Sequence, residues 1–353
     1  MAANIDIFEP RTMMQMVSTE FRARTFLRDR YFSNTQTFNT DAVDVDIVGP
    51  GKRKLAPFVG RRIGGTLDIR DGYKTRSFKP AYIAPFRVCT AEDAFKRAPG
   101  EDLYSGRSPN ERVAAIVAQD LNELDKEITR REEVMCAQAL TTGKIVIKGE
   151  GVDDVLNFWS ELQSSEQPKT TLDTLWSASG ADPLQDLRTL CRKISIASGK
   201  TPAEIIAGAK AVDALINALK GDANAFNSRR IDLGQIDPRS FADGVSYIGA
   251  LRLPALDVLT YDEVYYDEES GTNKPMIPED SILIACRGAA TTRAYGLVDI
   301  VNVASNTHSF VVGDRVPNSW LQMSNPAGRI VQLKSAPLMI VNEPLCFWIV
   351  KVV

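Results

Sequence analysis

The side chains that could support acid–base or nucleophilic chemistry are sparse in this sequence. The chain holds one histidine, His308, in the polar stretch SNTHSF. A Ser/His or Cys/His nucleophile system needs a histidine beside the nucleophile and a third group that orients it, so any such system would depend on His308 alone. We interpret His308 as a surface side chain and expect no catalytic residues.

The cysteines show no metal-binding or disulfide pattern. They are odd in number, far apart and never arranged as CxxC: Cys89, Cys136, Cys191, Cys286 and Cys346. Structural zinc sites use closely spaced cysteine and histidine ligands, which this sequence lacks. Reduced, buried thiols are the expected state. Together with an N-terminus that has no signal-peptide pattern, they indicate a cytosolic protein.

Three further patterns fall short of binding sites. GPGKRK at 49–54 lacks the GxxxxGK[ST] spacing of a phosphate-binding loop, and the glycines at 60–65 do not match a dinucleotide fingerprint. The acidic residues at 262–269 could offer oxygen ligands to calcium, but they lack the ligand order of a calcium-binding loop. We therefore expect a solvated hairpin at 262–269, no metal and no cofactor.

Charge is distributed unevenly along the chain, although the net charge is only −3. Residues 1–90 hold 15 basic and 9 acidic side chains, and residues 91–353 hold 27 basic and 36 acidic ones. The stretch 51–87 carries ten basic residues against two acidic ones. This asymmetry suits attraction between the basic part of one copy and the acidic part of another. No apolar run is long enough to span a membrane.

Binding of nucleic acid is an alternative interpretation of the basic stretch. Its aromatic residues could stack on bases: Phe58, Tyr73, Phe78 and Tyr82. Binding to the phosphate backbone depends on a surplus of positive charge. The negative net charge and the acidic second half of the chain therefore favour a contact between proteins.

The first 90 residues indicate segments that reach away from a compact core. Residues 1–37 are typical of an arm, because FRARTFLRDRYF alternates basic residues with aromatic ones and has few apolar neighbours in the sequence. The stretch 38–87 alternates apolar and polar residues as strands do, with turn signals at 64–65 and 71–72. It predicts a long two-stranded excursion with a basic, glycine-rich tip.

Residues 108–142 carry the clearest helix pattern. Ser108 is a suitable N-cap, Pro109 fits the first helical position, and Glu111 completes a capping box. Apolar residues recur near heptad spacing until Gly143, which predicts the end of the helix. A helix of this length extends roughly 50 Å and suits a spine that lies along a sheet.

The remaining sequence predicts a sheet with two or three covering helices. A helix should begin at Asp182, which precedes a proline. The run EIIAGA at 204–209 could belong to one long helix or form a short strand before a separate helix, and periodicity leaves both open. The apolar C-terminal residues 331–353 should form strands that are tied into the core.

Seven short motifs follow one another along nearly the whole chain. They are FLRDRYF (26–32), FKPAYIAP (78–85), TTGKIVIKGEGVDD (141–154), Trp176, Asp182-Pro183, RAYG (293–296) and VQLKSAPLMIVNEP (331–344). Together they resemble the lambda-type phage major capsid proteins, the capsid protein E family. The similarity is looser over 200–275. That family has a strand before a helix where EIIAGA stands, so the resemblance favours this alternative.

The resemblance implies an α+β fold of the Hong Kong 97 type. This capsid fold has an N-terminal arm, an extended β-hairpin loop, a peripheral domain with a long spine helix, and an axial α/β domain. The implied segments are the arm at 1–37, the loop with its flanking strands at 38–90, the peripheral domain at 91–181, the axial domain at 182–305, and strands returning to the peripheral domain at 306–353.

The resemblance also implies a function. The chain would be a major capsid protein that self-assembles into hexamers and pentamers of an icosahedral phage head enclosing double-stranded DNA. Its partners would be further copies of itself, a separate scaffold protein, a portal and a decoration protein, without sequence-specific DNA binding. It would be located in the virion and assembled in the host cytoplasm. Two alternatives stay open: a cellular encapsulin-like compartment shell of the same fold, and an oligomeric nucleic-acid-binding protein.

Three groups of residues are expected at contacts between subunits. The extended loop supplies basic residues: Arg61, Arg62, Arg70, Lys74 and Arg76. The arm supplies mainly apolar and aromatic residues: Phe26, Leu27, Arg28, Tyr31 and Phe32. The spine helix supplies acidic partners for the loop: Asp120, Glu123, Glu132 and Glu133. Exposed ion pairs contribute only about 0–1 kcal/mol each, so these pairs would set register more than strength.

Overall fold

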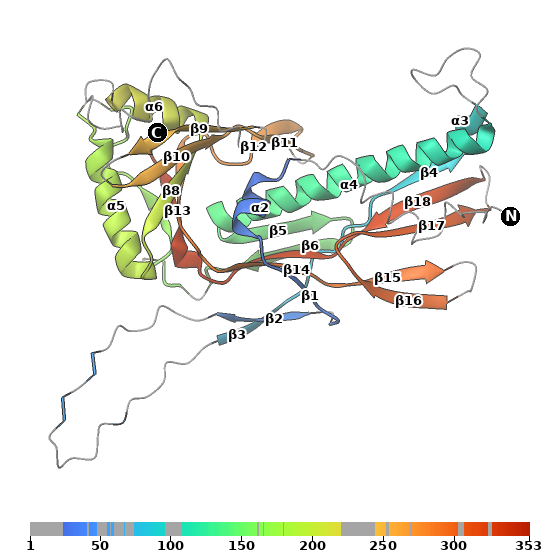
Figure 1. The fold of residues 1–353 in the computed structure, drawn as a ribbon, viewed down its shortest axis with the longest axis horizontal. Helices are drawn as coiled ribbons and strands as arrows, with labels where there is room; N and C mark the ends of the chain where they lie inside the picture. The colour runs from blue at the N-terminus through green and yellow to red at the C-terminus, as the bar shows by residue number, and fades with distance from the viewer. Residues whose placement is uncertain are drawn as a thin grey trace.

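Both helices and strands are abundant in the structure, which confirms the predicted α+β class. The computed structural model describes residues 24–40, 42–47, 55–56, 58–59, 67, 74–95, 108–160, 162–164, 166–178, 180–219, 244–251, 254–268, 270–302, 307–323 and 327–353. Figure 1 shows an elongated body along one long helix, with a further sheet and two helices at one end of it.

Helix α4, Pro109–Thr141, is the spine that the sequence predicts. The Ser108 hydroxyl accepts a hydrogen bond from the Glu111 N–H at 3.3 Å, and the Glu111 carboxylate accepts one from the Ser108 N–H at 2.8 Å. The chain turns away at Gly143, where φ is +65° and a Cβ atom would lie 2.2 Å from the Trp159 ring. Glycine fits here because it has no Cβ and tolerates a positive φ.

Two three-stranded sheets lie along α4. The first has the order β17–β18–β4, and the second has the order β1–β14–β19. Their strands are β17 Val316–Gln322, β18 Gly328–Lys334, β4 Phe86–Thr90, β1 Thr35–Thr37, β14 Thr291–Tyr295 and β19 Pro337–Val341. The apolar stripe of α4 packs on the first sheet, where Val117 and Leu121 contact Val331. The heptad-like spacing therefore marks the face that meets the sheet.

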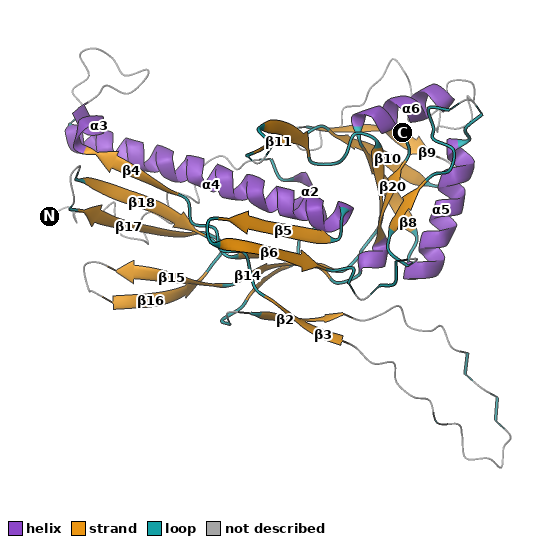
Figure 2. Cartoon of the chain, turned by 180° about the vertical axis from the view of Figure 1, so that it is seen from behind, coloured by secondary structure: helices purple, strands orange, loops and turns teal. Residues whose placement is uncertain are grey.

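Shorter elements complete the body around α4. The paired strands are β2 Val43–Ile47 with β3 Lys74–Phe78, β5 Lys144–Gly149 with β6 Val152–Asn157, and β15 Leu297–Asn302 with β16 Thr307–Val312. The short helices α2, Phe26–Tyr31, and α3, Ala91–Phe95, contact α4. The pairing of β2 with β3 confirms that the predicted excursion has a two-stranded base (Figure 2).

A six-stranded sheet forms the other part of the molecule, in the order β7–β20–β13–β8–β10–β9. Its strands are β7 Lys169–Thr171, β20 Phe347–Lys351, β13 Ser281–Cys286, β8 Pro202–Ala207, β10 Leu256–Tyr261 and β9 Val245–Leu251. Helix α5, Pro183–Ser198, covers the face turned away from α4 (Figure 2), and helix α6, Ala209–Leu219, contacts β10 and β13. The strand β8 followed by α6 confirms the alternative that the resemblance favoured for EIIAGA.

The acidic hairpin and the short turn before the last strand lie beside this sheet. Strands β11, Val264–Asp267, and β12, Thr272–Pro275, form the hairpin predicted at 262–269. The 3₁₀ turn η1, Pro344–Cys346, leads directly into β20.

The predicted division of the chain needs correction in the second half. Strands β17, β18 and β19 do return to the body along α4, but β20 belongs to the six-stranded sheet between β13 and β7. Conversely, β14 and β15 of the predicted axial segment 182–305 lie with the body. In β20 the consecutive residues from Phe347 to Val350 are all buried, so both faces of this strand are covered. A strand of that kind belongs in the interior of a sheet that is covered on both sides.

Candidate subunit-contact regions

Helix α2 lies inside the molecule. The side chains of Phe26, Leu27 and Phe32 are 6%, 0% and 0% exposed and belong to the main hydrophobic core. Tyr31 meets Phe347 of β20 edge-on, with ring centroids 5.3 Å apart. The prediction that the arm residues at 26–32 contact a neighbouring subunit is therefore corrected, because their apolar surface is already buried in the core of their own chain.

Glu133 of α4 holds the N-terminal end of α2. Its carboxylate accepts hydrogen bonds from the backbone N–H groups of Leu27 at 2.7 Å and Arg28 at 3.1 Å. The Tyr261 hydroxyl of β10 donates a third hydrogen bond at 2.9 Å. Burial raises the pKa of Glu133, and the three donors oppose that shift. One carboxylate thus joins α2, the spine helix and the six-stranded sheet.

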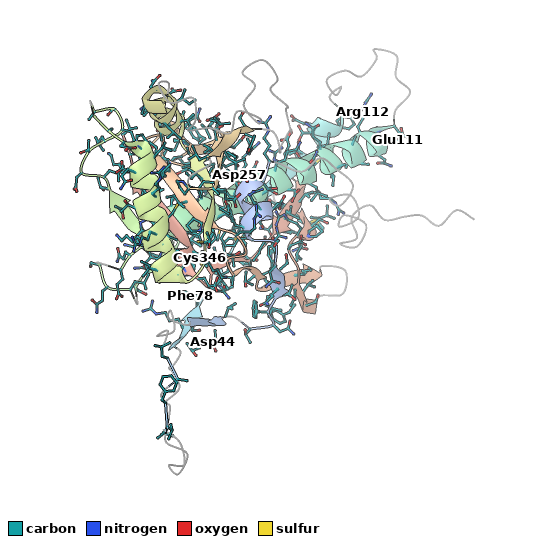
Figure 3. All side chains as sticks on the ribbon, turned by 60° about the vertical axis from the view of Figure 1, so that its left-hand side comes forward. Asp44, Phe78, Glu111, Arg112, Asp257 and Cys346 are labelled. Carbon is teal, nitrogen blue, oxygen red and sulfur yellow. The ribbon has the colours of Figure 1, made fainter. Side chains whose placement is uncertain are left out.

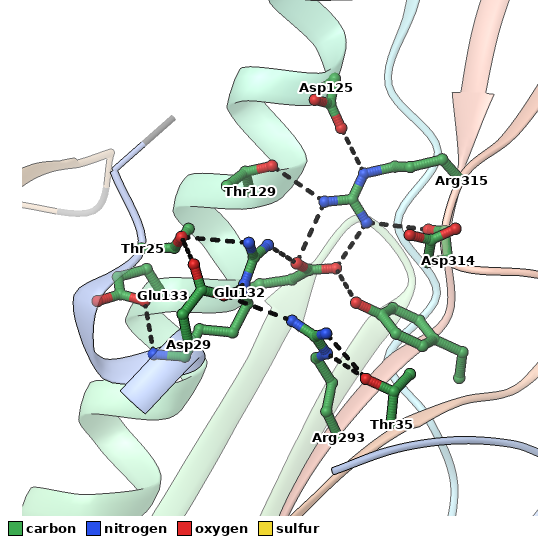
Figure 4. A network of polar contacts seen from close by, with 12 residues as sticks. Thr25, Asp29, Thr35, Asp125, Thr129, Glu132, Glu133, Arg293, Asp314 and Arg315 are labelled. Atoms are coloured by element: carbon green, nitrogen blue, oxygen red, sulfur yellow. Dashed lines mark hydrogen bonds and ion pairs between the residues drawn. The ribbon is translucent and has the colours of Figure 1, made fainter. Parts of the chain in front are cut away.

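Glu132, the adjacent residue, lies between two arginines from distant parts of the chain (Figure 4). The Arg28 guanidinium lies 2.9 Å from Glu132 Oε2, and that of Arg315 lies 2.7 Å from Glu132 Oε1. Arg315 also donates to Asp125 at 2.6 Å, and the Tyr295 hydroxyl donates to Glu132 at 3.1 Å. Burial works against the charge of Glu132, but the two guanidinium groups outweigh it and lower its pKa.

We call these five charged residues the buried ion network: Arg28, Asp125, Glu132, Glu133 and Arg315. Glu132 and Glu133 have no exposed surface, so the prediction that they form part of an acidic face for a neighbour is wrong. A charge without surface access must be satisfied within the fold, because leaving it unpaired costs several kcal/mol. The structure does bring arm and spine residues together, but within one chain.

The other two predicted spine residues remain near the surface. Asp120 accepts a hydrogen bond from the Arg87 guanidinium at 3.1 Å, and Glu123 binds the same guanidinium. Glu127 lies 3.4 Å from it as well. The side chains of Arg87 and Glu123 are 34% and 39% exposed. One guanidinium therefore faces three carboxylates, and this acidic stripe keeps a negative charge that water can reach.

The paired strands at the base of the extended segment are fixed to the core. Val43 of β2 is 1% exposed and stands opposite Phe78 of β3, whose ring centroid lies 5.4 Å from that of Phe158. Arg76 donates to the Asn157 carbonyl at 3.5 Å. Of the other basic residues predicted to contact a neighbour, Lys74 lies in β3, and the three arginines at 61, 62 and 70 lie outside the described residues.

Three apolar side chains of the extended segment are exposed in the structure. Leu55 and Leu67 are each 93% exposed, and Phe58 is fully exposed. They contrast with the anchored base, where Val43 and Phe78 are buried. The segment therefore combines a fixed base with exposed apolar surface of the kind that often marks a contact between proteins.

Three of the motifs that carry the resemblance meet at one junction. The backbone groups of Ile83 and Ser335 exchange two hydrogen bonds of 2.9 Å. Pro80 lies so close to Gly296 that a Cβ atom on this glycine would be 2.9 Å from the proline ring. The segment that leads away from β3 is thus fixed between the RAYG motif and the C-terminal motif.

A buried lysine closes this junction. The Lys334 ammonium lies 3.2 Å from the Asp299 carboxylate of β15, and the Tyr82 hydroxyl donates to the same carboxylate at 2.8 Å. The hydrogen bond from Tyr82 and the charge of Lys334 together lower the pKa of Asp299 against the effect of burial. Asp299 therefore ties β15 both to Lys334 of β18 and to Tyr82 of the segment that follows the extended loop.

Sequence interpretation missed Arg315, Asp125 and Arg87. The sequence does contain a signal for Asp125. It follows Leu121 of the apolar stripe by four residues and therefore lies on the same buried face of the helix. Glu132 follows Ile128 by the same interval. No comparable signal marks Arg315, which lies between β16 and β17, far away in the sequence.

Other chemistry is limited within the part of the chain that the structure describes. All five cysteines are free thiols. Among the described residues, no group of three or more histidine, cysteine or acidic side chains is placed to hold a metal ion. The described helices include none with an apolar stretch sufficient to cross a membrane. His308 is a residue of β16, opposite Val301 of β15.

Comparisons with known proteins agree with this architecture. The P21 prophage-derived major head protein of Escherichia coli O6:H1 (strain CFT073) is 25% identical over 356 residues, which cover 98% of this chain and 99% of that protein. The major capsid protein of Escherichia phage lambda is 25% identical over 329 residues, covering 90% and 91%. The crystal structure of a prophage capsid protein from E. coli CFT073 superposes with a TM-score of 0.69 at 19% identity, covering 98% and 99%.

The likeness to this solved structure shows the fold and confirms the Hong Kong 97 type that the resemblance implied. The family model described as phage major capsid protein E matches residues 9–352. The match runs from the first described helix to the last strand, so it includes the buried ion network and the junction at Lys334. This chain belongs to the phage major capsid protein E family.

Proposed function

We propose that copies of this chain assemble into hexamers and pentamers that close an icosahedral phage head around double-stranded DNA. The observation that carries the proposal is the extended segment. Its base is anchored through Val43 and Phe78, while Leu55, Phe58 and Leu67 expose their side chains almost completely. Apolar groups held away from their own core gain stability when a neighbour covers them. Figure 3 labels Asp44 and Phe78, which belong to the paired strands at the base of the segment.

The proposed neighbour contact pairs opposite charges. Arg61, Arg62 and Arg70 of the extended segment would approach the acidic stripe of an adjacent subunit, where Asp120, Glu123 and Glu127 share one arginine. Each exposed ion pair is weak, at about 0–1 kcal/mol, but the contact recurs around a closed ring. Repetition converts weak contacts into a stable assembly with a defined register.

Further partners follow from the same function. A separate scaffold protein would guide curvature during assembly in the host cytoplasm, a portal would occupy one vertex, and a decoration protein could bind the outside. The enclosed DNA would be held without sequence-specific contacts. The family match and the prophage and phage relatives support a structural role in the virion and no catalytic role.

Electron microscopy of the purified protein tests the shell directly. Closed particles, or rings of six and five subunits, are expected at physiological salt, with or without an added scaffold protein. Dispersed monomers under all these conditions would overturn the proposal. A salt-sensitive shift of DNA in a gel would then favour the nucleic-acid-binding alternative.

A charge-reversal pair tests the contact itself. Arg61→Glu with Arg62→Glu should block assembly or produce misshapen particles, because the variant places like charges against the acidic stripe. The control variant, Arg192→Glu with Arg287→Glu, makes the same change in net charge in the part of the molecule that contains the six-stranded sheet. It should leave the particles normal. Normal shells from the Arg61 and Arg62 variant would refute the assignment of the loop contact without refuting the shell.

A further inference from the structure

The hairpin β11–β12 turns one side toward the core and the other toward solvent. Along residues 262–268 the side chains alternate between exposed and half-buried. The exposed ones share one side of the hairpin, because successive side chains of an extended strand point to opposite faces. We call them the hairpin row: Asp262, Val264, Tyr266 and Glu268. The row places two apolar side chains, which are 49% and 64% exposed, between two carboxylates.

The inner side of the hairpin is fixed, so the row has a defined direction. Tyr265 packs against the main hydrophobic core. The Glu263 carboxylate lies 3.4 Å from the guanidinium of Arg24, which precedes α2. Asp267 forms an ion pair with Lys274 of β12. Exposed apolar side chains with a polar rim often mark contacts between proteins. The hairpin row is therefore an interaction surface for apolar groups that are accompanied by positive charge.

The extended segment has the composition that this surface requires. The stretch 51–87 carries ten basic residues against two acidic ones, whereas residues 262–275 hold five acidic residues and one lysine. Leu55, Phe58 and Leu67 are almost completely exposed. The acidic stripe can pair with the basic residues of the segment but offers no apolar contact, because α4, which the structure describes over its whole length, exposes no large apolar side chain. The hairpin row supplies both kinds of contact.

The distance between the two acidic surfaces is within the reach of the segment. Tyr261, which directly precedes the row, donates a hydrogen bond to Glu133 of α4 at 2.9 Å. Asp120 precedes Glu133 by 13 residues, which is about 20 Å along a helix. Arg61 follows Leu55 by six residues, and a chain of six residues spans at most about 20–22 Å. One segment can therefore meet the row with Leu55 and the acidic stripe with Arg61.

The arrangement of the elements favours a contact between two copies. The base of the extended segment, β2–β3, lies on the opposite side of the body from β11–β12 (Figures 1 and 2). The segment and the row are thus two different surfaces that belong to different sides of the molecule. A contact between two such surfaces repeats head to tail, and it closes into a ring where the rotation between neighbours allows.

We propose that the hairpin row of one copy binds the extended segment of the next. The exposed apolar residues of the segment cover Val264 and Tyr266, and its basic residues lie against the carboxylates at the two ends of the row. The row thereby holds the apolar part of the segment while the acidic stripe holds its arginines. This inference rests on the proposed function, because it needs copies that assemble, and it names the surface that covers the apolar residues.

Photo-crosslinking of assembled particles tests this pair of surfaces directly. The full-length protein carries p-benzoylphenylalanine in place of Tyr266, and isotope-labelled and unlabelled copies are mixed before assembly. Irradiation should join this position to a peptide from residues 51–70, and pairs of labelled with unlabelled peptides should appear. Crosslinks confined to one copy, or crosslinks to any other surface of a neighbour, would overturn the inference and leave the shell itself in place.

Two matched variants test the strength of the contact, with assembly followed by light scattering. Val264→Ala with Tyr266→Ala should raise the protein concentration at half-maximal assembly by about tenfold or more. Val155→Ala with Phe310→Ala removes side chains that are 47% and 67% exposed, close to those of the row, and should assemble as the wild type does.

The outcomes separate this inference from the proposed function. Equal assembly of the two variants would contradict a role of the hairpin row, whereas the wild type would still form shells. A wild type that stays dispersed would refute the proposed function and this inference with it.

Discussion

The Glu133 carboxylate on the spine helix lies 2.7 Å from the backbone nitrogen of Leu27, across 106 residues of sequence. The same carboxylate accepts hydrogen bonds from the next N–H of α2 and from Tyr261 of the six-stranded sheet. A helix N-terminus has backbone donors without partners inside the helix, and here a side chain of another helix satisfies two of them. The first described segment of the chain is therefore held by the middle of the chain.

Replacing this carboxylate should release α2. Glu133→Ala leaves two buried N–H groups and the Tyr261 hydroxyl without their acceptor, so we expect a loss of about 3 kcal/mol in the free energy of unfolding. Hydrogen exchange should increase first at residues 27–32. Glu127→Ala changes an acidic residue of the same helix that is 47% exposed, and it should cost less than about 0.5 kcal/mol. Equal losses in the two variants would show that Glu133 does not hold α2.

Acid should weaken the buried ion network at Glu132. The pKa of Glu132 in the folded chain lies below its ordinary value of 4.5, because Arg315 and Arg28 outweigh the effect of burial. Glu132 therefore binds a proton more tightly in the unfolded chain than in the folded chain. Glu132 therefore contributes stability above its ordinary pKa, and this contribution is lost as the pH falls through the folded pKa. Glu133, whose pKa burial raises, has the opposite sign and partly compensates.

Chemical denaturation at a series of pH values measures this effect. The free energy of unfolding of the wild type should fall more steeply below about pH 4.5 than that of Glu132→Gln, which cannot ionise. At neutral pH this variant should lose about 3–5 kcal/mol, because two buried arginines lose the charged carboxylate that they share. Glu150→Gln, an exposed residue between β5 and β6, should keep the wild-type slope. Parallel curves for the wild type and Glu132→Gln would contradict the assignment.

Two glycines with similar backbone angles should respond differently to alanine. Gly143 has φ +65° and faces the Trp159 ring, 2.2 Å from where a Cβ would lie, whereas Gly151 has φ +78° with open space around it. Gly151→Ala should cost about 1 kcal/mol for the backbone conformation alone. Gly143→Ala should cost several kcal/mol more, because the tryptophan must also move. Thermal unfolding of the two variants measures this difference, and similar midpoints would argue against the close contact between Gly143 and Trp159.

The core position of α2 makes a prediction for Leu27. Leu27→Ala should lower the free energy of unfolding by about 3 kcal/mol, because the side chain is 0% exposed and its removal leaves a cavity. Phe310→Ala removes a larger side chain that is 67% exposed and should change stability by less than about 0.5 kcal/mol. If Leu27→Ala keeps the wild-type stability but impairs assembly, the arm interpretation from the sequence would be restored.

Local sequence signals predicted the elements whose determinants lie within a few residues. Ser108 and Glu111 form their capping box with each other, and the hairpin β11–β12 closes around its own turn. The strand β8 before α6 needed the resemblance as well, because a run of six residues carries too little periodicity.

Long-range partners explain what the sequence did not reveal. FLRDRYF resembles an exposed arm because its apolar neighbours, such as Tyr261 and Phe347, lie far along the chain. Glu132 and Glu133 were predicted to be exposed, because ionised side chains are seldom buried without a partner. Arg28 and Arg315, the partners of Glu132, come from opposite ends of the sequence, and only the folded chain brings them together.

The contact between Tyr31 and Phe347 also has a kinetic consequence. It joins the first described helix to the last described strand, so α2 cannot complete its packing until almost the whole intervening chain has found its place. Contacts of such long sequence separation form late, because the entropy of closing the loop must be overcome before they add stability. Docking of α2 should be a slow, final phase of refolding, during which Leu27 and Phe32 stay exposed to other chains.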